Sequence, residues 1–291
     1  KILSIEPNHF DSTFLLATIF ALDNNFDKAK KLLYKALEIQ PKNVNVLNNL
    51  GTAYKALGND KEAINYYSKV LQIDLNHVNA HYNLGIIYHK LKELEKAKNY
   101  FQKTVEIQNN YALAFFGLAN VYVDLKAFEK AVSCYQKTIE LNPKIIGAYN
   151  NLGLVFRILN DFKNAIHCYD QALKIKPDHA GVHHNLALAY KEIGDFKNAI
   201  KSHESALKSE PNNIMHYFYL SAFKKDILND TLRNKIKKII ENDSCKKRDM
   251  AFGNYLLAKY ARKTKDYKNE LDYLKKGKSK FFFFKKKKKK K

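Results

Sequence analysis

Small and apolar residues recur along the chain at helical spacing, in two short segments that alternate. Between residues 146 and 177, the first segment places such residues three or four apart, at Tyr149, Leu152, Gly153 and Phe156. The second segment does the same, at Ala165, Tyr169 and Ala172. Asn160 lies between the two segments and Pro177 follows them. This pattern predicts a helix, a tight turn and a second helix that ends at the proline.

The same unit returns every 34 residues. All five prolines fall on one grid with that period, at Pro7, Pro41, Pro143, Pro177 and Pro211. Leu75 and Asn109 occupy the two remaining grid points. Six full units begin at Phe10, Val44, Val78, Ala112, Ile146 and Ala180. A fixed period of this length indicates stacked repeats, each of which is too small to bury its apolar face alone.

Within a unit numbered from 1 to 34, four positions keep one kind of side chain. Position 7 is always leucine, at Leu16, Leu50, Leu84, Leu118, Leu152 and Leu186. Position 8 is always small, at Ala17, Gly51, Gly85, Ala119, Gly153 and Ala187. Position 11 is always aromatic, at Phe20, Tyr54, Tyr88, Tyr122, Phe156 and Tyr190. Position 20 is always alanine, at Ala29, Ala63, Ala97, Ala131, Ala165 and Ala199. Small residues on facing helices predict a close approach of the two backbones.

Two further positions mark the ends of helices. Position 15 is Asn24, Gly58, Lys92, Lys126, Asn160 or Gly194, and the prevalence of Gly and Asn predicts a left-handed residue that ends the first helix. The residue after proline is Asn8, Asp178 or Asn212 in three units, which predicts that it caps the next helix.

The Leu-Gly/Ala, aromatic, Ala and Pro positions resemble the tetratricopeptide repeat, and the match covers residues 10–213. The resemblance implies an all-α, right-handed superhelical solenoid of helix-turn-helix repeats. The chain departs from the family at position 4, where tryptophan is common. That position holds Thr13, Leu47, His81, Phe115, Tyr149 and His183, and the chain has no tryptophan.

The repeats give the domain organisation. Residues 1–9 match the end of a second helix, so we expect a truncated upstream repeat, and residues 10–213 form six units. In residues 214–280 the register weakens, with a first helix expected over 214–228 and a lysine-rich amphipathic helix over 230–242. Asp249–Gly277 returns to the repeat pattern. Residues 281–291 form a low-complexity Phe/Lys segment, interpreted as a disordered tail or a sequence artefact.

Composition narrows the setting and the partners. The net charge is +22, of which seven charges are the terminal run Lys285–Lys291, and this favours a solvated surface over a nucleic-acid surface. Cys134, Cys168 and Cys245 form no metal-spaced pair, which favours a reduced, cytoplasmic setting. The sequence shows no signal pattern and no apolar run long enough to span a membrane.

The candidate binding residues follow the inner side of the predicted first helices. Position 6 carries amides at Asn49, Asn83, Asn151 and Asn185, with Leu15 and Gly117 interrupting the series. Position 5 adds Asn48, Tyr82, Asn150, Phe116 and His184, and position 12 adds Lys55, His89, Arg157 and Lys191. A row of amides can bond an extended peptide backbone without reading its sequence, and the cations suit acidic segments. The asparagine series resembles that of O-linked N-acetylglucosamine transferase, in which it implies polypeptide binding.

No catalytic constellation, cofactor fingerprint or small-molecule site is evident, and no metal site is predicted. The ten histidines are interpreted as core or surface residues without a cluster of cysteines or carboxylates beside them. The lysine-asparagine pattern of chaperone-binding repeats is absent. The predicted function is therefore a protein-interaction scaffold that binds a protein or peptide in its concave groove.

Two alternatives stay open. In the first alternative, the array is the accessory arm of a larger transferase. This alternative rests on the asparagine series and on residues 214–280, which resemble repeat-containing sulfotransferases through Tyr219-Leu220-Ser221 and Asp266-Tyr267-Lys268. In the second, the lysine-rich surface binds nucleic acid.

Overall fold

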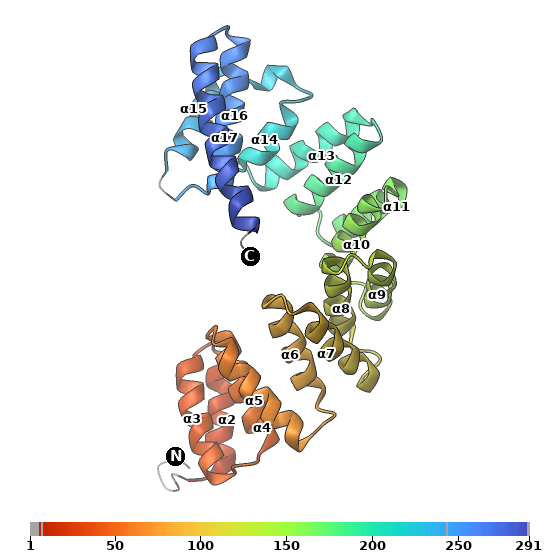
Figure 1. The fold of residues 1–291 in the computed structure, drawn as a ribbon, viewed down its shortest axis with the longest axis vertical. Coiled ribbons are helices and arrows are strands. Elements are labelled where there is room, and N and C mark those ends of the chain that lie inside the picture. The colour runs from red at the N-terminus through yellow and green to blue at the C-terminus, as the bar shows by residue number, and fades with distance from the viewer. Residues whose placement is uncertain (1–5, 7, 243, 290–291) are drawn as a thin grey trace. The chain divides into compact units, whose positions relative to one another are not determined.

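The fold is all-α over the part of the chain that the computed structural model describes, which is residue 6 and residues 8–242 and 244–289, with side chains up to Ser279 (Figure 1). No strand occurs among these residues. The chain divides into two compact units, Lys1–Ala148 and Tyr149–Lys291. Helix α10 (Ile146–Ile158) contains the boundary between them.

The helices of the first unit come in four pairs. They are α2 (Phe10–Leu22), α3 (Phe26–Ile39), α4 (Val44–Ala56), α5 (Asp60–Ile73), α6 (Val78–Lys90), α7 (Leu94–Ile107), α8 (Ala112–Asp124) and α9 (Phe128–Leu141). The two helices of each pair pack together, and the second helix also packs against the first helix of the next pair. The first helices α2, α4, α6 and α8 also contact one another in succession. Each repeat therefore touches only its neighbours, as in a solenoid.

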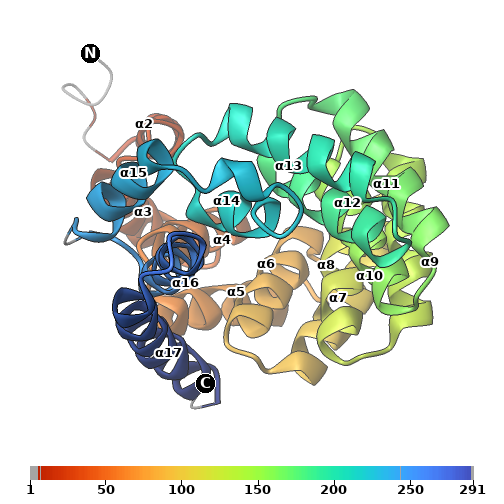
Figure 2. The ribbon, with the colours of Figure 1, turned by 90° about the horizontal axis from the view of Figure 1, so that it is seen from above.

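The second unit continues the pairs and then departs from them. Its helices are α11 (Phe162–Ile175), α12 (Ala180–Glu192), α13 (Phe196–Ser209), α14 (Ile214–Leu220), the 3₁₀ turn η1 (Lys225–Ile227), α15 (Asp230–Ile240), α16 (Lys247–Lys263) and α17 (Tyr267–Lys289). Helices α12 and α13 pack as a pair, and so do α16 and α17, which lie side by side in both views (Figures 1 and 2).

The turn between paired helices is left-handed at position 15 in all six repeats, as the sequence predicts. The φ angles there are 59° at Asn24, 78° at Gly58, 63° at Lys92, 60° at Lys126, 60° at Asn160 and 78° at Gly194. Lysine adopts this conformation in two repeats although its Cβ disfavours it. The helix pair is therefore strong enough to impose the turn on an unsuited residue.

The predicted helix caps are wrong by one residue. Pro41 and Lys42 occupy a turn that the amide of Asn43 closes on the carbonyl of Gln40 at 3.1 Å. The residue after proline is thus inside the turn, and the cap falls to position 34. Asn43 Oδ1 accepts from the amide of Val46 at 3.1 Å. Three histidines accept the equivalent bond through Nδ1, namely His9, His77 and His179.

The small residues are buried where the paired helices meet. Ala63, Ala97 and Ala165 are all 0% exposed, which confirms the prediction for position 20. At position 8, a Cβ on Gly51 would lie 2.7 Å from Tyr67 Cε1. In the second repeat, position 8 is therefore glycine because the Tyr67 ring at position 24 of the same repeat occupies the space.

One ring explains an interruption in the asparagine series. A Cβ on Gly85 would lie 2.8 Å from Phe101 Cδ1, and a Cβ on Gly117 would lie 2.6 Å from Phe101 Cζ. Phe101 thus lies between two glycines of consecutive first helices, α6 and α8. No side chain fits at position 6 of the fourth repeat, so an asparagine there is sterically excluded.

Position 4 functions without tryptophan by bonding back to the preceding turn. His81 Nε2 lies 2.9 Å from the carbonyl oxygen of Leu75, and His183 Nε2 lies 2.8 Å from that of Pro177. Tyr217, the equivalent residue after the sixth repeat, donates its hydroxyl to the carbonyl of Pro211 at 3.0 Å. These side chains fix the link between repeats at position 32.

The expected first helix over 214–228 is wrong in length. Helix α14 ends at Leu220, and Ser221 Oγ donates to the carbonyl of Phe218 at 2.7 Å, which competes with continuation of the helix. The chain then turns so that Leu228 is buried with Leu232 and Ile236 of α15. The amphipathic helix expected at 230–242 is confirmed as α15.

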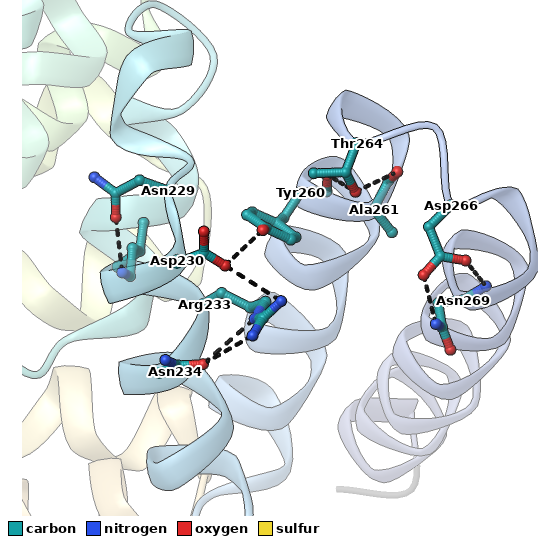
Figure 3. Close-up of polar contacts among 10 residues, drawn as sticks. Asn229, Asp230, Arg233, Asn234, Tyr260, Ala261, Thr264, Asp266 and Asn269 are labelled. Carbon is teal, nitrogen blue, oxygen red and sulfur yellow. Dashed lines mark hydrogen bonds and ion pairs between the residues drawn. The ribbon is translucent and has the colours of Figure 1, made fainter.

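Helices α16 and α17 repeat the geometry of a regular unit. Lys265 is left-handed with φ 60°, and Asp266 caps α17 by accepting from the amide of Asn269 at 3.2 Å and from its Nδ2 at 2.6 Å (Figure 3). Asp195 and Asn198 make the same pair of bonds, so α13 and α17 begin with the same cap. The hydroxyl of Tyr260 donates to Asp230 at 2.7 Å and joins α16 to α15 (Figure 3).

Helix α17 continues to Lys289, so the backbone of the Phe/Lys segment is helical up to that residue. Its side chains, and residues 290–291, lie outside the described residues. The predicted upstream repeat falls on residues 1–9, of which 1–5 and 7 also lie outside them.

Candidate functional site

The candidate residues of the first unit meet across consecutive first helices. Lys55 of α4 donates its Nζ to Oδ1 of Asn83 on α6. Burial lowers the pKa of the Lys55 ammonium group. Position 12 of one repeat is thus joined to position 6 of the next, as a cation and an amide.

Asn48 and Asn49 of α4 lie half-buried in the same unit. The Oδ1 of Asn48 is buried and has no hydrogen-bond partner among the described residues. An acceptor without a partner costs stability, so this amide oxygen is a site at which an added donor would be favourable.

Tyr82 and His89 of α6 are held by residues outside this helix. Tyr82 packs against Phe101 at 5.9 Å between ring centroids and against the edge of Tyr111 at 5.0 Å. Burial raises the pKa of the Tyr82 hydroxyl. His89 Nε2 lies 3.1 Å from Oδ2 of Asp124 on α8. His89 therefore contributes to the joint between the third and fourth repeats, whereas Tyr82 packs within its own repeat.

In the second unit, three candidate amides form a chain. Asn150 of α10 donates Nδ2 to Oδ1 of Asn151 at 3.1 Å. Asn185 of α12 donates Nδ2 to Oδ1 of Asn150 at 2.8 Å. The structure thus brings together position 5 of one repeat and position 6 of the next repeat.

The cations at position 12 of this unit differ in exposure. Arg157 is half-buried, and its Nε is buried without a hydrogen-bond partner among the described residues. Lys191 is exposed and lies 4.0 Å from Glu192, a distance at which an exposed ion pair contributes little. Arg157 therefore has an unused donor, whereas Lys191 is a solvated charge.

Three histidines form a group that the sequence analysis missed. His184 of α12, His203 of α13 and His216 of α14 each offer a ring nitrogen, and these nitrogens lie within 4.8 Å of one another. Burial lowers the pKa of His184 to about 4 and that of His203 to about 3. It also lowers the pKa of His216, so all three rings are neutral near pH 7. His203 and His216 are core residues, as the sequence analysis interprets them, but their grouping with His184 was not predicted.

Comparison with known families identifies the chain. The model of the cilia and flagella-associated protein 70 C-terminal domain matches residues 11–227. The chain belongs to this family. The match begins in α2 and ends at η1, so it includes the six repeats and the start of the irregular region.

Solved structures agree with a tetratricopeptide-repeat fold for the chain. The crystal structure of MamA is 28% identical, with a TM-score of 0.54, over 56% of this chain and 95% of that chain. PilF of Pseudomonas aeruginosa is 20% identical, with a TM-score of 0.65, over 74% and 97%. YrrB, described as a TPR protein with an unusual peptide-binding site, is 20% identical, with a TM-score of 0.56, over 64% and 95%. No curated protein matches the chain.

These similarities show that the family member described here is an all-α tetratricopeptide-repeat protein. The resemblances to the glycosyltransferase and the sulfotransferases are not tested by them. Across the described residues, no helix combines the length and the apolar character needed to cross a membrane.

Proposed function

We propose that the chain is a protein-interaction scaffold. Within each of the two compact units, the side chains at positions 5, 6 and 12 of the first helices bind an extended peptide segment. The observation that supports this most is the pairing of amides and cations across consecutive first helices, Lys55 with Asn83 and Asn150 with Asn185. YrrB, with the same fold, is described as having a peptide-binding site. The proposal assigns an analogous activity to this chain.

The chemistry of the proposed contact is an exchange of hydrogen bonds. Each primary amide carries two donor hydrogens and an acceptor oxygen, so Asn83 and Asn185 keep bonding capacity after their internal bonds are made. A peptide backbone offers one donor and one acceptor per residue, which the amides can bind without selecting a side chain. The unpartnered oxygen of Asn48 and the unpartnered Nε of Arg157 add one acceptor and one donor.

The preferred peptide carries acidic side chains. Lys55 is partly buried, so an acidic group that displaces its neutral amide partner gains an ion pair in a less solvated place. Because the family is named for cilia and flagella, the selected peptides are compared first with segments of proteins from these organelles.

The test begins with short random peptides displayed on phage and selected against the full 291-residue chain. The selected peptides are then synthesised, and their dissociation constants are measured by fluorescence anisotropy against Asn83→Ala and Asn185→Ala. Loss of one hydrogen bond of about 1 kcal/mol weakens binding about fivefold for the variant in the unit that holds the peptide.

The matched control is Asn79→Ala, which removes an exposed amide from the same helix as Asn83. It leaves the dissociation constant unchanged. The proposal is wrong if no acidic or extended peptide is selected, or if Asn83→Ala and Asn185→Ala bind every selected peptide as tightly as the unaltered chain while keeping its helicity.

A further inference from the structure

The histidine cluster of the second unit brings together three helices. The ring centroids of His184 and His203 are 5.6 Å apart, those of His184 and His216 are 5.5 Å apart, and those of His203 and His216 are 6.0 Å apart. His203 and His216 are each 1% exposed. The cluster is therefore enclosed where α12, α13 and α14 meet.

The cluster replaces apolar side chains of the regular repeat. His184 is at position 5, His203 at position 24, and His216 at position 3 of the following segment. In the third repeat the first two positions hold Tyr82 and Phe101, whose rings also lie in contact, at 5.9 Å. Position 3 of the next repeat is there a small residue, Ala114, which is fully buried. The sequence thus exchanges apolar groups for ring nitrogens at three neighbouring positions at once.

The other histidines of the chain have identified neighbours or lie at the surface. His9, His77 and His179 cap helices, while His81 and His183 bond carbonyl groups, His89 faces Asp124, and His167 is exposed. By contrast, His184 and His203 make no hydrogen bond to any other described residue. The Nδ1 atoms of all three clustered rings are buried without a hydrogen-bond partner among the described residues, as are those of His81 and His183, whose other ring nitrogens bond carbonyl groups. Buried polar atoms left without partners are costly, so their concentration at one point calls for a ligand.

We propose that His184, His203 and His216 bind a Zn²⁺ ion. Three imidazoles are an established donor set for this ion, with water or a donor from a bound molecule completing a tetrahedron. Nitrogens at about 2.0–2.1 Å from a tetrahedral ion lie about 3.3 Å apart. The ring nitrogens now lie up to 4.8 Å apart, so each nitrogen has to move by about 1 Å, through rotation of its side chain, to reach this geometry.

A carboxylate lies near the ligand on α14, just beyond hydrogen-bond distance. Oε2 of Glu210 lies 3.7 Å from Nε2 of His216, which leaves Nδ1 of that ring for the metal. Carboxylates that hold the second nitrogen of a ligand histidine orient the ring and raise its basicity. Because the ligands come from the sixth repeat and from the segment after it, Zn²⁺ would fasten the irregular C-terminal region to the array. The alternative is a metal-free aromatic core in which His203 stacks on Tyr219, with centroids 5.5 Å apart.

The experiment is a titration of the full chain, freed of metal by a chelator, with ZnCl₂. Isothermal calorimetry measures affinity and stoichiometry, and thermal unfolding measures stabilisation. We expect one Zn²⁺ per chain at micromolar affinity or tighter, and a rise of several degrees in the unfolding midpoint, since an ion that binds only the folded state stabilises it. With Co²⁺ in place of Zn²⁺, visible absorption reports tetrahedral coordination.

Two variants and one control decide the assignment. His203→Phe introduces the residue found at position 24 of the third repeat, and His216→Ala introduces the residue found at position 3 of the fourth. Each is expected to weaken binding at least tenfold and to abolish the thermal shift. His183→Tyr, which introduces the position 4 residue of the fifth repeat next to the cluster, leaves both unchanged.

The proposal is overturned if the full chain binds no Zn²⁺, or if His203→Phe and His183→Tyr bind it equally well. If His203→Phe loses helicity, His184→Phe takes its place, because Phe116 occupies position 5 of the fourth repeat. Zn²⁺ binding is measured without any peptide, so a negative result in the zinc titration contradicts the metal site alone and leaves the proposed scaffold function untouched.

Discussion

Replacing Gly51 by alanine tests whether the ring at position 24 sets the size of position 8. Gly51 lies in the middle of α4, where alanine favours the helix over glycine by about 0.5–1 kcal/mol. The added Cβ would lie 2.7 Å from Tyr67 Cε1 and 2.9 Å from Cζ. Tyr67 is 0% exposed, and its hydroxyl lies 3.0 Å from the hydroxyl of Thr52, which limits how far the ring can move.

The expected balance is destabilisation. Overpacking of a core costs about 1–3 kcal/mol. In the fourth repeat, Ala119 at position 8 is buried together with Tyr135 at position 24, so a tyrosine ring can shift to make room for a Cβ. We therefore take about 2 kcal/mol, the middle of this range, as the cost of overpacking. After the helical gain, Gly51→Ala is expected to lower the free energy of unfolding by about 1 kcal/mol.

A second background isolates the contact. Tyr67→Leu recreates the combination of the first repeat, in which Ala17 and Leu33 hold these two positions. Without the ring, Gly51→Ala keeps only its helical gain and raises the free energy of unfolding by about 0.5–1 kcal/mol. The coupling between the two changes is therefore about 2 kcal/mol.

The assay is urea unfolding of the full chain, followed by far-ultraviolet circular dichroism. A nearest-neighbour model is fitted because repeats need not unfold together. Gly181→Ala serves as the control, since Gly181 is exposed and a Cβ there meets only the His179 ring, at 3.3 Å rather than the 2.7 Å found at Gly51. The packing argument is refuted if Gly51→Ala stabilises the chain with Tyr67 present, or if the two changes are additive.

Three further predictions follow from single contacts, and unfolding midpoints in urea check each of them. Asn43→Ala is expected to cost about 1 kcal/mol by removing the cap of α4, whereas Lys42→Ala, in the turn, has no effect; equal losses would contradict the position of the cap. Lys126→Gly is expected to stabilise by about 0.5–1 kcal/mol, because glycine accepts the φ of 60° without a Cβ penalty, and a loss would refute the strain. Glu270→Ala is expected to change stability by less than about 1 kcal/mol, because the Glu270 side chain is only 11% exposed but its partner Arg262 is 74% exposed and stays hydrated when the carboxylate is removed; a loss of about 3 kcal/mol or more would show that the pair is a buried one.

The sequence predicts the repeated part of the fold well, because each repeat presents the same few constraints. Ala63 and Ala97 are buried as their column predicts, and Asn24 and Lys126 share a left-handed turn although only one suits it. The predicted caps are one residue too early because the proline at position 32 and the residue after it both belong to a turn. The types of these residues do not show that the turn includes both of them. Helix α14 is short because Ser221 bonds its own helix and Leu228 has a core to enter.

The candidate site is less predictable from the sequence, because the hydrogen bonds of its residues depend on which side chains lie nearby in space and not on the residue type at one repeat position. Position 6 can be read from the sequence, yet the partners of Asn83 and Asn150 come from adjacent repeats and different positions. The histidine cluster was missed for the same reason. His203 leaves an otherwise large hydrophobic column and His216 leaves a column of small residues. The sequence signal for the cluster is that both columns change to histidine at positions that face each other across the joint between repeats.

Phe101 restricts how this array can change by gain or loss of whole repeats. A shared period allows any block of 34 residues to be duplicated or removed without shifting the backbone register. The block that follows residues 78–111, however, must bring glycine at its sixth position to admit the Phe101 ring. Among the six blocks only residues 112–145 do so, with Gly117. Recombination that separates these two blocks creates a steric collision, so the pair is inherited, or engineered, as one module.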